Sequence, residues 1–551
     1  MYDKKLQTVV TVVWLVMCAA GKATFAETSV PMGEQLYRCC EDGLSLEELS
    51  RVGVTMLSHC PWTTDMKEME RYLQKAHSLG IKVLPYVSVE KAWELEGLLL
   101  ERFNQLAPLT AIPYYRAVDP TYHWEWVLVN GDGCYMPRYG TLIRKEDGTW
   151  EVDWSRWFIY GQWNYRNPPN SYSWYMCSSA QGYREAVVKG VRAVMDMGFD
   201  GIFLDNTCTT RLPRCFGPEF GKHEHVDNEN TDKSYLKIAQ LIYKAVKSYG
   251  DDKILMLNSG EEDVYTDYRD TCMLESYVIG GGNKRWDWEL ITKFDEQLKD
   301  ERKHNRAVCA LSYVRDEMPP YPDKDNIFYA YTCAKLSGFL WSCVADEHLD
   351  VIRIFYRALL KTPVGEKQQQ DGVYFRHYKN GIIVVNPGKQ SCRVRLPLCG
   401  AVRKPVELYT LNRLPVTDGE CTIDIPAQSG RVITDFNDAV DNLLNECIDD
   451  LKRTLKRLPE LAEETGGMEK IERKEFVKQG VALADRLEKV LSLSRTNKTK
   501  PELLGLLEKV QTWFGSLAPV QDDQIQRNCR AAGYAGALSE LLTDVQVAGQ
   551  P

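Results

Sequence analysis

The chain alternates short apolar runs with amphipathic stretches between residues 36 and 343. Eight apolar runs have the length and apolar character of buried strands, at residues 36–40, 54–59, 81–86, 201–205, 254–258, 272–275, 307–313 and 338–343. Stretches with apolar residues at helical spacing lie between them, at residues 46–52, 66–78, 183–197, 233–249, 287–303 and 326–336. This alternation predicts an α/β fold with a parallel sheet, and eight such strands predict a closed (β/α)8 barrel.

The clearest of these units is a helix at residues 183–197 that leads into the strand at residues 201–205. Gly198 follows the last helical turn, where glycine commonly ends a helix. The strand then ends abruptly on Asp205 and Asn206. In a (β/α)8 barrel, catalytic groups lie at the carboxyl ends of strands, so Asp205 is a candidate catalytic residue. The alternative is an aspartate that only opens the next loop.

Length and charge restrict the classes of function. At 551 residues the chain is too long for one compact domain, and its apolar content is ample for a large core. The formal net charge of -9 is spread along the chain without a long basic run. Such a charge provides no electrostatic footprint for nucleic acid or for an anionic membrane, so we expect neither partner.

The first 26 residues have the pattern of a secretory signal peptide. Lys4 and Lys5 precede an apolar run at residues 8–20, and small residues suited to cleavage end at Ala26. The run is too short for a comfortable membrane span and is followed by Lys22. We therefore expect a secreted or periplasmic protein with no membrane span after removal of the signal peptide.

The rest of the chain divides into three regions by pattern. The barrel is expected at residues 27–365, with a long insertion at residues 111–177 that contains seven of the fourteen tryptophans. Residues 366–436 read as short antiparallel strands, including a hairpin turned at Asn380 and Gly381. Residues 437–551 read as a charged helical bundle with apolar stripes, whose helices are candidates for self-association.

The tryptophan-rich insertion has two interpretations. A long insertion in a barrel usually decorates the catalytic face, and aromatic rings stack on the apolar faces of sugars. We therefore expect the insertion to lie over the carboxyl ends of the strands, with at least one tryptophan exposed toward Asp205. The alternative is that the insertion needs its aromatic residues for a small core of its own.

Cysteine and histidine usage does not predict a metal site. The chain has 17 cysteines, and the 16 that remain if Cys18 leaves with the signal peptide suggest a mixture of disulfides and buried thiols. Paired Cys-x-x-Cys spacing is absent from the sequence, which argues against structural zinc. His223 and His225 lie in a polar stretch that is more often simply solvated. We therefore predict no metal and no cofactor.

Two strand-tip carboxylates, Asp205 and Glu275, match the needs of glycoside hydrolysis. This reaction uses one carboxylate that stabilises or attacks the sugar and one carboxylic acid that protonates the leaving oxygen, about 5 Å apart in retaining enzymes. The apolar residues 272–274 favour a protonated Glu275, and hydrogen bonding from Asn206 favours an ionised Asp205. A structural salt bridge between Glu275 and Arg285 is the alternative.

Other polar residues at the predicted strand tips are candidate substrate contacts. They are Arg38, His59, Tyr86, Asn206, Asn258, Arg315, Asp316 and Asp346. Each alone is more often a loop residue, but together they would line one face of the barrel. Asp316, Asp346 and Glu347 are the alternative acids if Glu275 does not fill that role.

Four segments, at residues 176–185, 198–206, 257–260 and 273–276, resemble a set of glycoside hydrolases with (β/α)8 barrels. These are distantly similar to the alpha-galactosidase group and to endo-alpha-1,4-polygalactosaminidases. The resemblance covers residues 36 to about 435 and implies a nucleophile at Asp205 and a second carboxylate at Glu275. The alpha-galactosidase group has an aspartate at the second position, so Glu275 departs from that pattern.

The sequence thus predicts a secreted glycoside hydrolase, of retaining type, that acts on a polysaccharide or oligosaccharide. A non-catalytic carbohydrate-binding or scaffold protein on the same barrel is the main alternative. A metal-dependent hydrolase is less favoured because the histidines are spread over several loops.

Overall fold

The structure is a computed structural model, and it describes only part of the chain. The described residues are 36–38, 45–51, 54–58, 66–88, 91–95, 128–136, 141–153, 157–159, 162–164, 171–205, 214–227, 231–258, 263–279, 285–298, 306–313, 323–344, 360, 362–410, 412–435 and 438. The predicted signal peptide and, apart from residue 438, the predicted helical region at 437–551 lie outside them.

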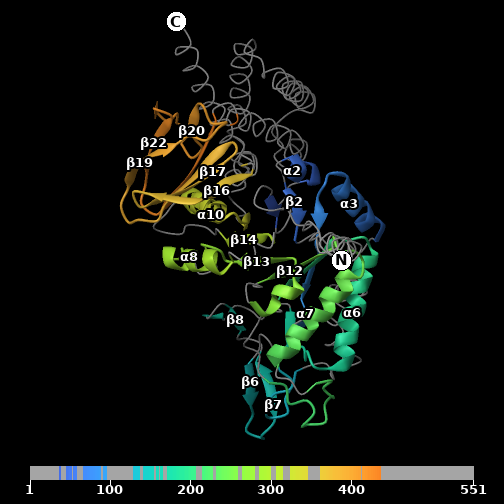
Figure 1. The fold of residues 1–551 in the computed structure, drawn as a ribbon. Coiled ribbons are helices and arrows are strands. Elements are labelled where there is room, and N and C mark those ends of the chain that lie inside the picture. The colour runs from blue at the N-terminus through green and yellow to red at the C-terminus, as the bar shows by residue number, and fades with distance from the viewer. Residues whose placement is uncertain are drawn as a thin grey trace, which may run out of the picture.

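Two parallel sheets form the centre of the fold (Figure 1). The first has the order β15 (Leu340–Val344), β14 (Val308–Tyr313), β13 (Thr271–Glu275), β12 (Ile254–Asn258), β11 (Gly201–Asp205) and β4 (Tyr86–Ser88). The second has the order β1 (Leu36–Arg38), β2 (Val54–Leu57) and β3 (Lys82–Val83). All pairings within these sheets are parallel.

One predicted strand joins the two sheets. It is split into β3 and β4 at Leu84 and Pro85, because proline has no N–H to donate to a ladder. The Leu84 N–H still donates to the Leu57 carbonyl on β2 at 2.8 Å, and the Pro85 carbonyl accepts from Phe203 on β11 at 3.0 Å. At the other edges, β1 lies next to β15. The predicted parallel sheet is confirmed, and closure of the eight strands into a barrel stays a prediction.

Helices connect the strands in the predicted alternation. They are α2 (Leu46–Arg51), α3 (Met66–Ser78), α6 (Gln181–Asp196), α7 (Thr231–Lys247), the 3-10 helix η2 (Asp263–Tyr268), α8 (Trp288–Gln297) and α10 (Asp323–Ser337). In α6 the predicted apolar positions are buried, and Gly198 adopts a φ of 94° directly after the last turn. The helix therefore ends where the sequence indicated, and the chain turns into β11.

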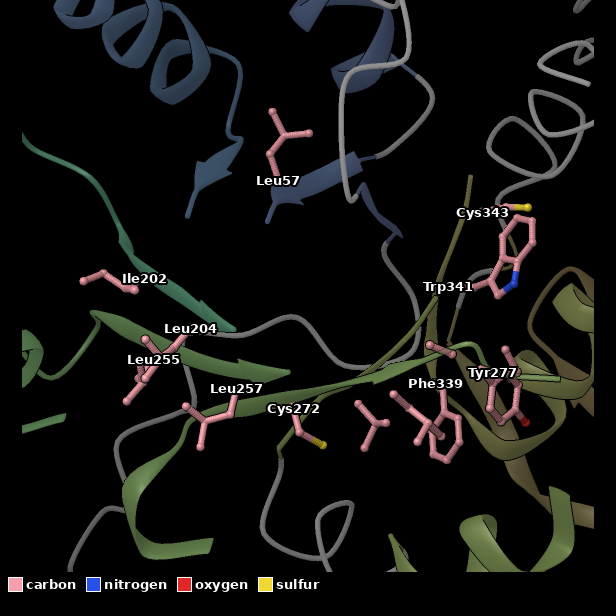
Figure 2. Close-up of a cluster of buried hydrophobic side chains, with 14 of the residues drawn as sticks. Leu57, Ile202, Leu204, Leu255, Leu257, Cys272, Tyr277, Phe339, Trp341 and Cys343 are labelled. Carbon is pink, nitrogen blue, oxygen red and sulfur yellow. The ribbon is translucent and has the colours of Figure 1, made fainter. Parts of the chain in front are cut away.

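The parallel strands bury both faces. One set of alternating residues packs together with residues of the helices in the largest apolar cluster (Figure 2). It includes Leu57, Ile202, Leu204, Leu255 and Leu257. The intervening residues form a separate cluster, which draws on β2, β4, β11, β12, β13, β14 and β15 and on the Leu84 segment. A residue on a strand faces opposite to its neighbours, so this second cluster defines the other face of the sheets.

Residues 363–435 form two antiparallel sheets. The larger has the order β16 (Pro363–Gln370), β17 (Val373–Tyr378), β18 (Gly381–Asn386), β23 (Ser429–Asp435) and β20 (Pro405–Glu407). The smaller has the order β19 (Cys392–Pro397), β22 (Glu420–Ile425) and β21 (Val416–Thr417). Apolar residues of both sheets share one buried cluster, and β17 and β18 pair up to Tyr378 and Gly381, next to the predicted turn.

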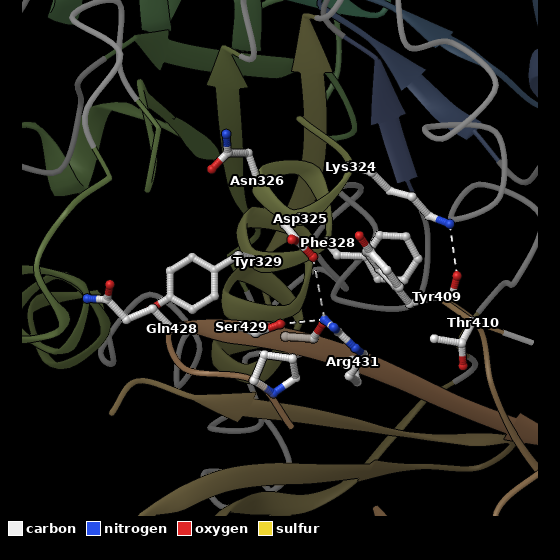
Figure 3. Close-up of polar contacts among 12 residues, drawn as sticks. Lys324, Asp325, Asn326, Phe328, Tyr329, Tyr409, Thr410, Gln428, Ser429 and Arg431 are labelled. Carbon is white, nitrogen blue, oxygen red and sulfur yellow. Dashed lines mark hydrogen bonds and ion pairs between the residues drawn. The ribbon is translucent and has the colours of Figure 1, made fainter. Parts of the chain in front are cut away.

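Helix α10 packs against the larger antiparallel sheet through a polar contact zone (Figure 3). The buried Arg431 guanidinium of β23 lies 3.9 Å from Asp325 of α10 and 4.2 Å from the centre of the Tyr409 ring. Lys324 of α10 donates to the Tyr409 carbonyl at 2.8 Å. Burial, together with Asp325, raises the pKa of Tyr409 to about 12, so its phenol stays protonated in this contact.

The insertion predicted at residues 111–177 is only partly described. Its described strands include two short antiparallel pairs, β6 (Thr141–Arg144) with β7 (Trp150–Asp153) and β8 (Trp157–Ile159) with β9 (Gln162–Asn164). A third pair joins β10 (Ser171–Tyr175) to β5 (Lys91–Leu95), which precedes the predicted insertion. The predicted exposure of a tryptophan toward Asp205 lies outside the described side chains.

The ten described cysteines are free thiols, and seven of them are buried. The buried thiols expected from the sequence are therefore present, and the expected disulfides are not found among these ten. No described helix combines the length and the apolar character that a bilayer crossing needs.

A tight contact between α10 and β23 at Gly430 gives a testable prediction. A Cβ on Gly430 would lie 1.7 Å from the Thr332 hydroxyl of α10, so Gly430→Ala must push the helix and the strand apart. We expect this substitution to cost about 1–3 kcal/mol, seen as a lower Tm in calorimetry.

Gly190→Ala is the matched control. Gly190 lies inside α6, and an added Cβ would meet nothing within 4 Å. Alanine is the better helix former, so this variant should gain about 0.5–1 kcal/mol and raise Tm. A Gly430→Ala protein as stable as wild type would contradict the packing described here.

Candidate active site

Polar side chains stand at the carboxyl ends of the parallel strands, next to the second apolar cluster described above, which we call the inner cluster. In β11, β12, β13 and β14 the inward residues Phe203, Met256, Met273 and Leu311 are buried in that cluster. Two positions further along each strand, on the same face, stand Asp205, Asn258, Glu275 and Tyr313. The strand period therefore directs these four side chains to one place.

Asn258 connects the two carboxylates. Its side-chain nitrogen Nδ2 donates to Asp205 Oδ1 at 2.7 Å and to Glu275 Oε2 at 2.7 Å. The amide NH2 group has two hydrogens, so one is available for each carboxylate. The opposite amide orientation would point an oxygen at both carboxylates and repel them, which supports this assignment. The bridge fixes the spacing of the two acidic groups.

Each carboxylate also accepts a hydrogen bond from a tyrosine. The Tyr86 hydroxyl of β4 donates to Asp205 Oδ2, and the Tyr313 hydroxyl of β14 donates to Glu275 Oε1 at 2.7 Å. Asp205 and Glu275 are half-buried, and Asn258 is buried. Both acidic groups are thus held by two neutral donors and remain partly accessible to solvent, as groups that must meet a substrate require.

The backbone beyond Glu275 is bent sharply. Ser276 and Val278 both have a φ of 62°, in the left-handed region that a β-branched residue such as Val278 rarely adopts. The buried Tyr277 between them donates its N–H to the Leu311 carbonyl at 2.8 Å. Such strain persists only where the surroundings fix it, and it clusters at functional sites. Here the bent backbone, held by the Tyr277 hydrogen bond, determines where the chain leaves β13 after Glu275.

The structure describes three of the polar residues that were predicted to surround Asp205 and Glu275. Tyr86 and Asn258 contact the carboxylates as described above. Arg38 ends β1, and its side chain is outside the described set. The remaining predicted contacts, and the alternative acids, lie outside the described residues: His59, Asn206, Arg315, Asp316, Asp346 and Glu347.

Tyr313 was not among the residues predicted from the sequence. It ends the seventh predicted strand and shares the parity of Cys309 and Leu311, so the period-2 pattern was a usable signal. Arg285, the alternative partner of Glu275, donates to the Asn326 side chain and to the Gln428 carbonyl, both at 2.6 Å.

A second group of side chains has the donor atoms of a metal site. Cys177, Cys215, His223 and His225 each place one donor atom within 4.8 Å of the others. The two cysteines are buried and the two histidines are half-buried, which differs from the solvated loop expected for the histidines. The spacing along the chain did not reveal this group, because the fourth member, Cys177, lies in a different segment from the other three.

The two thiols of this group influence each other. A hydrogen bond from Cys177, followed by those from His223 and His225, holds the pKa of the Cys215 thiol far below its ordinary value despite burial. The same bond to Cys215, together with burial, raises the pKa of Cys177.

Comparison with known proteins supports the sequence interpretation over part of the chain. Residues 134–382 match the model of hypothetical glycosyl hydrolase family 15. This segment includes both carboxylates, Asn258 and Tyr313. No curated protein is significantly similar to the chain.

Several solved structures share low similarity with the chain. Eubacterium rectale Amy13B is 11% identical, with a TM-score of 0.41 over 75% of this chain and 98% of that one. The Nostoc punctiforme debranching enzyme is 11% identical, with a TM-score of 0.39 over 71% of this chain and 87% of that one. A variant of the glycoside hydrolase domain of PelA from Pseudomonas aeruginosa is 12% identical, with a TM-score of 0.33 over 57% of this chain and 95% of that one.

The resemblance to glycoside hydrolases that the sequence motifs indicated is thus confirmed by an independent match: over residues 134–382, this chain is similar to a family of hypothetical glycosyl hydrolases.

Proposed function

We propose that this chain is a secreted retaining glycoside hydrolase that cleaves a polysaccharide or oligosaccharide, on eight parallel strands closed into a barrel. The family match over residues 134–382 supports a glycosidase. The observation that carries the residue assignment is the Asn258 amide, which binds Asp205 and Glu275 at the same time. The pattern of the first 26 residues supports export.

The spacing of the carboxylates favours the retaining mechanism. Asp205 Oδ1 and Glu275 Oε2 each lie 2.7 Å from Asn258 Nδ2, so these two oxygens are separated by at most twice that distance. Retaining glycosidases place their carboxyl groups roughly 5–5.5 Å apart, whereas inverting ones need about 6.5–9.5 Å to admit a water molecule between them. The bridged pair fits the shorter spacing.

In the proposed mechanism, Glu275 is the acid and Asp205 is the nucleophile. Glu275 gives its proton to the glycosidic oxygen while an Asp205 oxygen bonds to the anomeric carbon, and the bond to the leaving group breaks. Glu275, now a carboxylate, then takes a proton from water as that water attacks the same carbon and releases Asp205. The Asn258 and Tyr86 donors hold Asp205 in position for both steps.

The barrel prediction and the site support each other. The inner apolar cluster contains Met56 of the three-stranded sheet and Leu340 at the far edge of the six-stranded sheet. Strands that share one interior on all sides are typical of a closed barrel, in which catalytic residues stand at the carboxyl ends. The side-by-side position of β1 and β15 is consistent with closure.

The first prediction for this site separates the roles of its two carboxylates. Asp205→Asn should abolish turnover but keep the fold and ligand binding, because the amide preserves shape and cannot form the glycosyl ester. Glu275→Gln should slow substrates with poor leaving groups by roughly a hundredfold to ten-thousandfold, because they need protonation.

Aryl-glycosides with activated leaving groups provide the control within the same enzyme. They need little protonation, so Glu275→Gln should still release their aryl group at a rate near that of wild type. Should the variant process both substrate classes as fast as wild type, the acid would have to be sought at Asp316, Asp346 or Glu347.

A second prediction concerns the bridging amide. Asn258→Ala removes the donor that both carboxylates share, and a lost hydrogen bond to a charged group is worth about 1.5–3 kcal/mol. We expect kcat/KM to fall by about tenfold to a hundredfold, measured on the best substrate found. Asn412→Ala, at an exposed position among the antiparallel strands, is the matched control and should leave the rate unchanged.

A third prediction concerns stereochemistry. NMR of the first sugar product should show the same anomeric configuration as the substrate, because two displacements at one carbon restore it. Initial release of the opposite anomer would disprove the retaining mechanism. Binding of sugars without any hydrolysis, across a broad panel of aryl-glycosides and polysaccharides, would support the carbohydrate-binding alternative instead.

A further inference from the structure

We propose that Cys177, Cys215, His223 and His225 bind one Zn²⁺ ion as a closed structural site. This inference is independent of the proposed glycosidase activity. It depends on the positions of the four donor atoms, on their surroundings, and on the two chain segments that they join.

The distances match those of a tetrahedral zinc site. Cys177 Sγ lies 3.3 Å from His225 Nε2, Cys215 Sγ lies 3.3 Å from His223 Nε2, and the two Nε2 atoms are 3.1 Å apart. With Zn–S bonds of about 2.3 Å and Zn–N bonds of about 2.0–2.1 Å, tetrahedral ligands stand roughly 3.3–3.8 Å from one another. A small adjustment of these side chains would therefore admit the ion.

The donor set selects zinc among the common divalent ions. Two thiolates and two imidazoles are soft to borderline ligands, which favour zinc and disfavour magnesium or calcium. Four protein ligands leave no open position for water or substrate, and this is the feature that separates structural zinc from catalytic zinc. The site is therefore expected to stabilise the fold and not to perform chemistry.

Backbone N–H groups are directed at the Cys215 sulfur. Val129 and Gly217 donate to Cys215 Sγ at 3.3 and 3.4 Å. Such donors stabilise negative charge on sulfur, and hydrogen bonds of this kind orient the ligands of metal sites. A buried cysteine that only filled space would not need two such donors.

The segments that carry the ligands are also held in place by contacts that involve no ligand side chain. Phe216 donates its N–H to the Val129 carbonyl at 2.8 Å, and Val226 donates to the Ser179 carbonyl at 3.0 Å. Asp227, two residues after His225, accepts from Arg184 of α6 at 2.8 Å and from Ser179 at 3.1 Å. The four donors are therefore gathered by the fold itself, which reduces the cost of ordering them around an ion.

The site would link two segments of the chain, one before β11 and one after it. Cys177 lies between β10 and α6, and Cys215, His223 and His225 all lie in the segment at residues 214–227, between β11 and α7. β11 ends on Asp205. A zinc ion here would fix residues 214–227, the next described segment after β11, against the segment that carries Cys177.

The test begins with the full-length protein purified without chelator. Elemental analysis should find about one zinc per chain, and X-ray absorption should show two sulfur and two nitrogen ligands. Removal of the metal with a strong chelator should lower Tm by several degrees, and added Zn²⁺ should restore it while Mg²⁺ should not. Cobalt in place of zinc should give the visible absorption bands of a tetrahedral thiolate site.

Matched cysteine variants complete the test. Cys215→Ser should reduce the zinc content to below about a tenth of an equivalent, because a ligand is lost. Cys134→Ser changes a free, half-buried thiol of the neighbouring segment that is outside the cluster, and it should keep the full zinc content.

Two results would overturn the proposal. One is a wild-type protein that contains no zinc as purified and whose Tm does not respond to added Zn²⁺. The other is a disulfide between Cys177 and Cys215, found by peptide mapping of the unreduced protein. Both measurements use the wild-type chain, so they decide the question even if Cys215→Ser fails to fold.

Discussion

The bridge from Asn258 to Asp205 and Glu275 is the interaction on which the geometry of the site depends. Two carboxylates that face the same space would repel each other, and a neutral amide that donates to both offsets this repulsion without adding charge. The three residues end β11, β12 and β13, which are neighbours in the sheet. The register of these parallel strands therefore sets the distance between the two acidic groups.

The inner apolar cluster supports this arrangement from below. Phe203, Met256 and Met273 are almost completely buried directly beneath the three polar residues on the same strands. Close packing at these positions prevents the strands from sliding, because a slip of one residue would exchange the inner and outer faces. Apolar packing and the polar site are thus two consecutive layers of one structure.

Sequence periodicity was enough to predict the parallel strands, the helices between them, and the strand tips where Asp205, Asn258 and Glu275 stand. These features can be predicted because the apolar pattern of a strand or a helix is visible within a short run of consecutive residues. Tyr313 could have been predicted by the same parity, but its aromatic character made it resemble a core residue.

The cysteine and histidine cluster could not be predicted in this way. Cys177 and His225 are brought together where the connection between β10 and α6 meets the segment before α7. This contact cannot be inferred from the spacing of the two residues along the chain. Rules based on ligand spacing recognise metal sites built on one local motif. A site assembled from several segments becomes visible only in three dimensions.

Helix α10 has a further consequence for how this protein unfolds. Every residue from Asn326 to Ser337 is buried, since the helix lies between the parallel strands on one side and β18 and β23 on the other. A helix without a solvent-facing side cannot remain in place when either neighbour is lost. The parallel strands and the antiparallel sheets should accordingly unfold as one cooperative unit, so neither part should fold stably when it is separated from the other.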